Sequence, residues 1–307
     1  MNHLPADQQV RFDKAVRHFR SGNGPVRVTP EKLRDFLTAT HDLDLPPAAR
    51  LRSLAIQLET EEFDQGWTGL RAIYEAAAEA DPADALVLHS WGISATHWAD
   101  KAKTPSTSGR AAIVSEAERV LHAALELAPG DSSVAHALGW LNYIHPATAE
   151  ATEKQRSEAL NWFERAVQWD PGNTLSQLYI SHCFHDRKDW RRAISEYEKV
   201  DLDRLPRDWP AWRAVKCREQ LAQCYAYAGD RAESLRRFTA FLDEADAWDK
   251  ESAEERIINL DELVKAATDI LMDPKLLRRA RLLAERLGFQ TWYPELSPAG
   301  RAPAVSP

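Results

Sequence analysis

Apolar residues recur every three or four positions along most of the chain, which is the spacing of one face of an α-helix. The pattern is clearest when it is counted backwards from three prolines, Pro82, Pro129 and Pro171. Alanine stands five residues before each proline, a large apolar residue eight before it, and a smaller one twelve before it. The three stretches are therefore predicted to be helices that bury equivalent faces. Their shared positions hold Ala77, Ala124 and Ala166; Tyr74, Leu121 and Phe163; and Leu70, Ala117 and Ala159.

Each proline also separates two helices. Two residues after it stands Asp or Asn, at Asp84, Asp131 and Asn173. Proline cannot continue a helix, and Asp or Asn caps the start of the next one. Ten residues after each proline stands a small residue preceded by a large apolar one, and a small residue there allows two helices to cross closely. These small residues are Gly92, Gly139 and Ser181.

The same spacing continues towards the C-terminus. Ala193 is followed by Tyr197, and Ala222 is followed by Ser234 and Phe238. Gly229 and Asp230 stop one helix and cap the next. The pattern thus predicts helix pairs at 48–63 with 67–80, 83–100 with 111–128, 132–145 with 153–169, 173–187 with 189–200, 211–228 with 230–245, and 252–272 with 274–287.

This combination resembles the tetratricopeptide repeat (TPR) family, whose signature is a small residue after Leu, then Ala, then an aromatic residue four later, then Pro. The resemblance covers roughly residues 48–246. It implies an all-α fold, a right-handed α-α superhelix of about five to six helix pairs preceded by N-terminal helices. The prolines are 47 and 42 residues apart, against a family period of about 34, so insertions are expected at 101–110 and 145–154. An unrelated helical bundle is the alternative.

The resulting division of the chain has four parts. Residues 1–47 form an N-terminal helical segment, with helices expected over Pro5 to Arg20 and Pro30 to Thr40. Residues 48–246 hold the repeats, and 247–290 form a C-terminal capping helix pair whose second helix is rich in arginine. Residues 291–307 contain small residues and prolines and are expected to be a flexible tail.

Charge and cysteine content limit the possible partners. The formal net charge is -8 and the pI is about 5.7, whereas a nucleic-acid-binding protein usually has a basic excess. No apolar run approaches the roughly 18 residues of a membrane span. The three cysteines show no paired spacing, which is typical of reduced thiols in a cytoplasmic protein. We therefore expect no nucleic acid and no membrane as partner, and the oligomeric state stays open.

TPR arrays bind ligands on the face that the first helix of each pair, helix A, provides. In the family, ligand contacts come from positions three before the small residue and one, four and five after it. Half of the ten histidines fall on these positions. The resemblance thus implies a groove of histidines and aromatic residues that suits an extended peptide or a partner helix. Its partner-binding candidates are His89, His97, His136, Trp140, Tyr143, His182, His185, Glu219 and Tyr227. Packing of these residues against neighbouring helices is the alternative interpretation.

The predicted function is a non-catalytic scaffold or adaptor that binds a protein or peptide, with no cofactor. Phosphate-binding glycine loops and Gly-x-Ser-x-Gly elbows are absent from the sequence. The alternative is a histidine-lined site with a metal-binding or enzymatic role. His182 and His185 lie three residues apart, and His136 or His145 would have to complete a set of three imidazoles. Without a cysteine pair or a His-Glu-x-x-His motif, no metal ligand is assigned.

Overall fold

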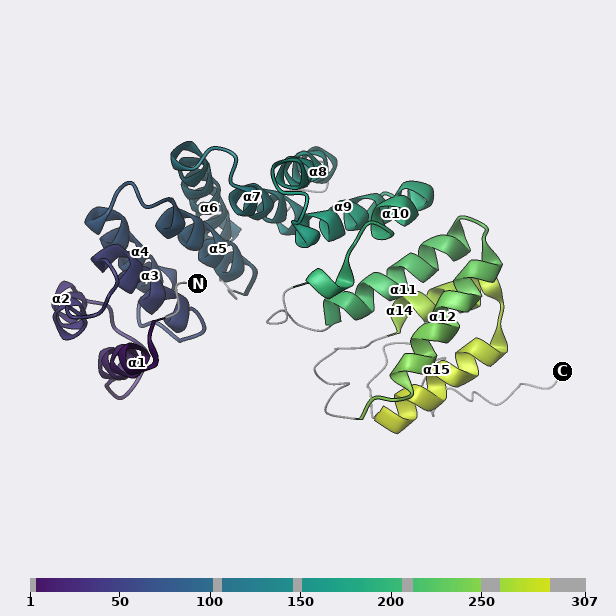
Figure 1. Ribbon diagram of the computed structural model, residues 1–307, viewed down its shortest axis with the longest axis horizontal. Coiled ribbons are helices and arrows are strands. Elements are labelled where there is room, and N and C mark those ends of the chain that lie inside the picture. The colour runs from purple at the N-terminus through teal and green to yellow at the C-terminus, as the bar shows by residue number, and fades with distance from the viewer. Residues whose placement is uncertain (1–3, 102–106, 146–150, 206–211, 250–259, 288–307) are drawn as a thin grey trace. The chain divides into compact units, whose positions relative to one another are not determined.

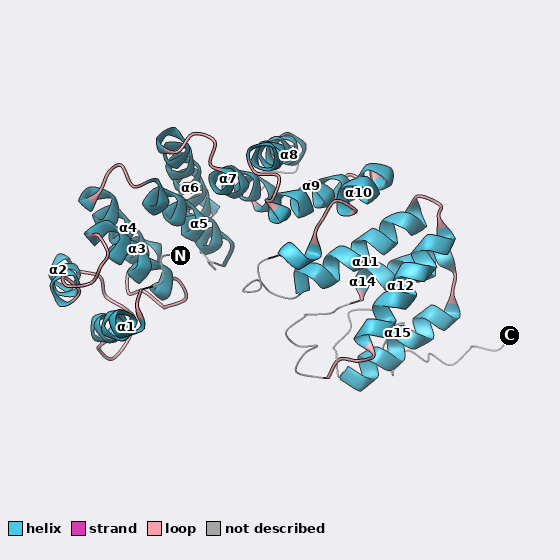
Figure 2. Cartoon of the chain, viewed as in Figure 1, coloured by secondary structure: helices cyan, strands magenta, loops and turns pink. Residues whose placement is uncertain are grey.

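The computed structural model describes residues 4–101, 107–145, 151–205, 212–249 and 260–287 (Figure 1). Regular structure in these ranges is helical (Figure 2), beside one isolated parallel bridge between Val26 and Phe63. The chain divides into two compact units, Met1–Asp170 and Pro171–Pro307. The prediction of an all-α fold is confirmed. Across the described residues, no helix combines the length and the apolar character that crossing a membrane requires.

The first unit begins with two helices that cover one end of its core. The aromatic rings of Phe12 and Phe19 pack edge-on against Phe36, with centroids 5.7 and 6.2 Å away. Thr29 caps the second of these helices, because its side chain accepts a hydrogen bond from the Lys32 backbone N–H. Three antiparallel helix pairs follow, α3 with α4, α5 with α6 and α7 with α8. The helices of this unit are α1 (Ala6–Arg20), α2 (Pro30–Ala39), α3 (Pro47–Leu58), α4 (Trp67–Ala80), α5 (Ala85–Lys101), α6 (Thr107–Leu127), α7 (Ser132–Ile144) and α8 (Ala151–Trp169).

The repeated sequence positions form the core of these pairs. All nine positions counted back from the prolines are fully buried. The small residues also act as predicted, because a Cβ atom added at Gly92 would lie 2.4 Å from Leu121 Cγ, and one at Gly139 would lie 2.7 Å from Phe163 Cδ1. The first helix of a pair can approach the second this closely only where the side chain is missing. The helix-pair pattern read from the sequence therefore describes the actual packing.

The second unit contains two further pairs and a C-terminal extension. Helix α9 packs on α10, and α11 packs on α12; helix α14 then packs on α11, and α15 on α12. The Ser234 hydroxyl of α12 donates to the Ala222 carbonyl of α11 at 2.8 Å. Its elements are α9 (Thr174–Asp186), α10 (Trp190–Tyr197), a 3-10 turn (Leu202–Arg204), α11 (Trp212–Tyr227), α12 (Arg231–Ala245), α14 (Asp261–Ala266), a π-helical turn (Ala267–Leu271) and α15 (Pro274–Leu287).

The predicted C-terminal cap is amphipathic. Helix α15 buries Leu276 and Leu283, and Arg279 on its other side binds Asp243 and Asp246 of α12, both at 2.8 Å. Its arginines therefore fasten the helix to α12.

All three cysteines are free and buried, as expected from the sequence.

Several boundaries differ from the predicted ones. Helix α3 ends at Leu58, not at 63, and Glu59 is its C-cap. The chain then turns towards α4 through Gly66, which has a φ of +58°. The structure divides the chain after Asp170, inside the region 48–246, and the predicted four-part division stays a prediction. The tail 291–307, residues 252–259 of the last predicted pair, and the insertion residues 102–106 and 146–150 lie outside the described residues.

Candidate binding face

Helices α3, α5 and α7 are the first helices of the three pairs in the first unit, and each contacts the next. The family positions on α5 and α7 were identified from Gly92 and Gly139. The equivalent small residue on α3 is Ala55, which follows Leu54 and is fully buried. The same offsets from Ala55 give Arg52, Ile56, Glu59 and Thr60, which the sequence pattern did not reveal because no proline stands ten residues before Ala55. We call the surface formed by these positions on α3, α5 and α7 the helix A face.

A hydrogen-bonded network organises the centre of the helix A face. His97 Nδ1 lies 2.6 Å from Glu59 Oε1 and donates to it, while the Ser94 hydroxyl donates to the other carboxylate oxygen at 3.1 Å. Because the Ser94 proton points to Glu59, the Tyr74 hydroxyl donates to Ser94, at 2.8 Å. Tyr74 is fully buried, and burial raises its pKa, so it remains a donor. The network fixes the carboxylate and, through it, the imidazole of His97.

His97 in turn lies against Trp140 of α7. The two ring centroids are 4.8 Å apart and the rings are nearly perpendicular, an arrangement that aromatic pairs favour. The His97 side chain remains 40% exposed, and Trp140 is half-buried. On α3, the Ile56 residue is 39% exposed. The helix A face thus presents an apolar side chain, an aromatic ring and an oriented imidazole to solvent.

Arg52 and His89 lie towards the other end of the same face. Arg52 Nε and His89 Nε2 are buried nitrogens without a hydrogen-bond partner among the described residues. Burial lowers the pKa of His89, and the carboxylate of Asp131 partly offsets this lowering. His89 is therefore neutral near pH 7, and Arg52 supplies the cationic charge here.

His136 and Tyr143 occupy the boundary between the helix A face and the core. Both are half-buried. The His136 ring lies 5.5 Å from the ring of Phe163 in α8, and the Tyr143 ring lies 6.5 Å from it. These two side chains support the position of α7 on α8 as well as forming part of the surface.

The candidates in the second unit make mostly internal contacts. His182 Nδ1 lies 2.8 Å from the Tyr197 hydroxyl, which itself donates to Gln220 Oε1 at 2.8 Å. The His182 nitrogen is therefore the donor to Tyr197, and burial lowers the pKa of His182 to about 3. His185 Nε2 donates to Gln223 Oε1 at 2.8 Å.

Glu219 and Tyr227 extend this internal arrangement. Glu219 is 1% exposed. Tyr227 stacks on Trp190 with ring centroids 4.9 Å apart, and its hydroxyl contacts Asp269. The structure thus brings His97 and Trp140 together at a surface, whereas it places the second unit's candidates largely between helices. The assignment of all nine residues to a partner stays a prediction.

His145 is held by neighbouring groups and not by another histidine. His145 uses both ring nitrogens, since Nδ1 accepts from Arg110 at 2.8 Å and Nε2 donates to the Thr96 carbonyl at 3.0 Å. In the part of the chain that the structure describes, no group of three His, Cys, Asp or Glu side chains is arranged to hold a metal ion.

No model of a known protein family matches the chain, and no curated protein matches it in sequence. Solved structures match its fold. PilW, a widely conserved type IV pilus biogenesis factor, is 14% identical with a TM-score of 0.53, and the match covers 81% of this chain and 96% of PilW. Human IFIT1, solved as a dimer with m7Gppp-AAAA, is 15% identical with a TM-score of 0.55, over 92% of this chain and 58% of IFIT1.

YrrB, described as a TPR protein with an unusual peptide-binding site, is 17% identical with a TM-score of 0.41, over 64% of this chain and 85% of YrrB. At such identities the likeness concerns the fold and not the ligand. The helix pairs, the close crossings at Gly92 and Gly139 and the structural matches to PilW and IFIT1 agree. The chain has a tetratricopeptide-repeat-like fold.

Proposed function

We propose that this protein is a non-catalytic adaptor that binds an extended peptide or a partner helix on the helix A face of its first unit. The observation that carries the proposal is the group formed by Glu59, His97 and Trp140, with Ile56 exposed on the same face. Tryptophan is the residue type most enriched among those that dominate binding energy at protein interfaces. An imidazole fixed by a carboxylate offers a polar contact without a further entropy loss on binding.

The charge of the face favours a protein over a nucleic acid. The chain is acidic overall, with a formal net charge of -8, and the central group of the face contains the carboxylate of Glu59. Arg52 and Glu59 give the helix A face no basic excess, and nucleic-acid affinity comes largely from the neutralisation of phosphates by Lys and Arg. The free thiols of Cys183, Cys217 and Cys224 support a reducing compartment such as the cytoplasm.

The test uses the full chain and a displayed library of random 12-residue peptides. Peptides selected on the wild-type protein are measured by calorimetry. We expect Trp140→Ala to weaken the selected peptides by at least about tenfold, or about 1.4 kcal/mol, and His97→Ala to weaken them to a smaller extent. Trp169→Ala is the matched control, because Trp169 is 39% exposed on α8 of the same unit and lies off the face.

Two results would contradict the proposal. One is that Trp140→Ala and Trp169→Ala bind the selected peptides equally well while both remain folded. The other is that no peptide is enriched and m7Gppp-AAAA or single-stranded RNA binds instead.

A further inference from the structure

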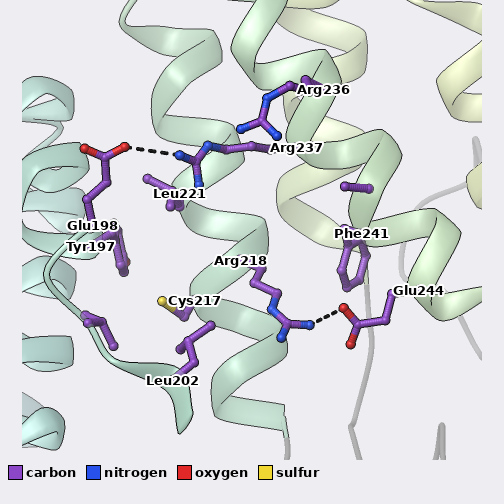
Figure 3. Close-up of a pocket in the computed structure, with 12 residues that line it drawn as sticks. Tyr197, Glu198, Leu202, Cys217, Arg218, Leu221, Arg236, Arg237, Phe241 and Glu244 are labelled. Carbon is purple, nitrogen blue, oxygen red and sulfur yellow. Dashed lines mark hydrogen bonds and ion pairs between the residues drawn. The ribbon is translucent and has the colours of Figure 1, made fainter. Parts of the chain in front are cut away.

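A cleft in the second unit opens between α10, α11 and α12 (Figure 3). Its volume is about 610 Å³, which lies within the range of about 300–1,000 Å³ typical of ligand pockets. It is lined by residues of this unit alone and does not include any helix A candidate. The cleft is therefore a feature separate from the proposed peptide-binding face.

The floor of the cleft is apolar and rigid. Tyr197, Cys217 and Phe241 are 2 to 3% exposed, and Leu221 is 7% exposed. Tyr197 is held in place from behind, because its hydroxyl lies in the hydrogen-bond network with His182 and Gln220. Burial raises the pKa of the Cys217 thiol to about 12, so this cysteine contributes an apolar surface and no reactive thiolate.

Two ion pairs stand at opposite ends of the cleft, as Figure 3 shows. Arg237 Nη2 lies 3.1 Å from Glu198 Oε1 at one end, and Arg218 Nη1 binds Glu244 Oε2 at the other. Arg236 lies beside Arg237 and binds Glu233. The lining therefore contains three guanidinium groups and two carboxylates.

The guanidinium groups keep free donors. Arg218 uses Nη1 for Glu244, which leaves the N–H groups of Nε and Nη2 without an acceptor among the described residues. Arg236 and Arg237 each use Nε and Nη2, which leaves Nη1. The side chains of Arg218 and Arg236 are 39% and 64% exposed, so these donors are accessible. Guanidinium groups bind carboxylates through two parallel N–H bonds. Arg218, whose Nε and Nη2 are free, can make this contact, and Arg236 can donate from Nη1.

The charge of the whole chain sharpens this preference. The lining carries a formal charge of +1, from three arginines and two glutamates, whereas the whole chain carries -8. This local excess of arginine above an apolar floor favours an acidic segment as the occupant, and electrostatic complementarity of this kind selects partners.

We propose that the cleft between α10, α11 and α12 is a second docking site, for an acidic amphipathic segment of a partner protein. One large apolar side chain of that segment enters the cleft above Leu221 and Phe241. Carboxylates on either side of it bind Arg218 and Arg236.

The experiment measures fluorescence anisotropy of labelled 12-residue peptides with the full chain. In one set a leucine, phenylalanine or tryptophan is flanked by glutamates, and in the matched set lysines replace the glutamates. We expect the acidic set to bind at least about tenfold more tightly than the lysine set. Arg218→Gln and Arg236→Gln are each expected to weaken the acidic peptides by about three- to tenfold.

Ala240→Trp tests the cavity itself. Ala240 lines the cleft and is exposed, so a tryptophan there fills the cleft without disturbing the core. It should abolish binding of the acidic peptides. Thr239→Trp, at the neighbouring exposed position outside the lining, and Arg192→Gln, which removes an exposed arginine elsewhere, are the controls and should leave the affinity unchanged.

Three results would overturn the proposal: no acidic peptide binds, the acidic and lysine sets bind equally, or Ala240→Trp and Thr239→Trp have the same effect. If the chain dimerises and Ala240→Trp restores the monomer in light scattering, the occupant is a second copy and the proposal is wrong. The two proposed sites can be distinguished, because Trp140→Ala on the helix A face should leave the affinity for the acidic peptides unchanged.

Discussion

Histidines at the helix A positions of different pairs have different environments. His97 is 40% exposed and is oriented by the carboxylate of Glu59. His182 instead donates to Tyr197, and His185 donates to Gln223, between helices of the second unit. Imidazole can serve in both places because its neutral form has one donor and one acceptor nitrogen. The histidine spacing in the sequence contains no information about what covers the helix A positions.

The environment of His182 makes stability depend on pH. Its pKa is about 3 in the folded state, against about 6.5 in an unfolded chain. Below pH 6.5 the unfolded chain therefore binds a proton that folded His182 does not, and the free energy of unfolding falls as the pH is lowered from about 6.5 towards 3. One such histidine changes the free energy of unfolding by at most about 1.4 kcal/mol per pH unit. We expect His182→Gln to reduce this slope in urea unfolding between pH 7 and pH 5, with the exposed His41→Gln as control. An unchanged slope would show that His182 is protonated in the folded state.

At the scale of helices, the close approach within each pair decides the packing. Gly92 of α5 faces Leu121 of α6, and Gly139 of α7 faces Phe163 of α8. Glycine lowers the stability of an isolated helix by about 1 kcal/mol relative to alanine. Here the missing side chain instead allows the two helices to pack at short distance.

Gly92→Ala is therefore expected to destabilise the protein, although alanine is the better helix former. A Cβ atom at this position lies 2.4 Å from Leu121 Cγ, so Leu121 must shift, at a cost of about 1–3 kcal/mol. Chemical denaturation measures the effect, and Gln57→Ala on the exposed side of α3 should change stability by less than about 0.5 kcal/mol. In a double-mutant cycle, Gly92→Ala should cost less when Leu121 is already alanine. Additive effects would exclude the contact as the cause.

At the scale of the whole molecule, the two compact units have separate hydrophobic cores. One core includes Leu54 and Leu70 of the first unit, and the other includes Phe238 and Leu263 of the second. In repeat proteins each unit is stabilised by its nearest neighbours, so unfolding need not be cooperative over the full chain.

We expect a cavity in one core to destabilise that unit alone. Leu263 and Leu54 are both fully buried, and each replacement by alanine should cost about 2–5 kcal/mol. Hydrogen exchange followed by mass spectrometry should show faster exchange in α11, α12 and α15 for Leu263→Ala, with α3 to α6 unchanged, and the reverse for Leu54→Ala. Equal acceleration in both units would mean that the chain unfolds as one.

The sequence by itself determined the helices, their order and their pairing. Caps such as Thr29 and Asp131, and apolar positions spaced by three and four, act between residues within one or two turns, so they can be read along the chain. The small residues Gly92 and Gly139 even marked where paired helices cross.

Only the tertiary structure decided which surfaces remain available. Glu219 occupies a helix A position, yet it is buried in the folded chain. Glu59 and His97 come together across 38 positions, and Glu198 and Arg237 across 39. Such contacts depend on how whole helices pack, and no local rule of spacing or propensity determines them. For this physical reason the fold was readable from the sequence, while the network under His97 and the arginine-edged cleft were not.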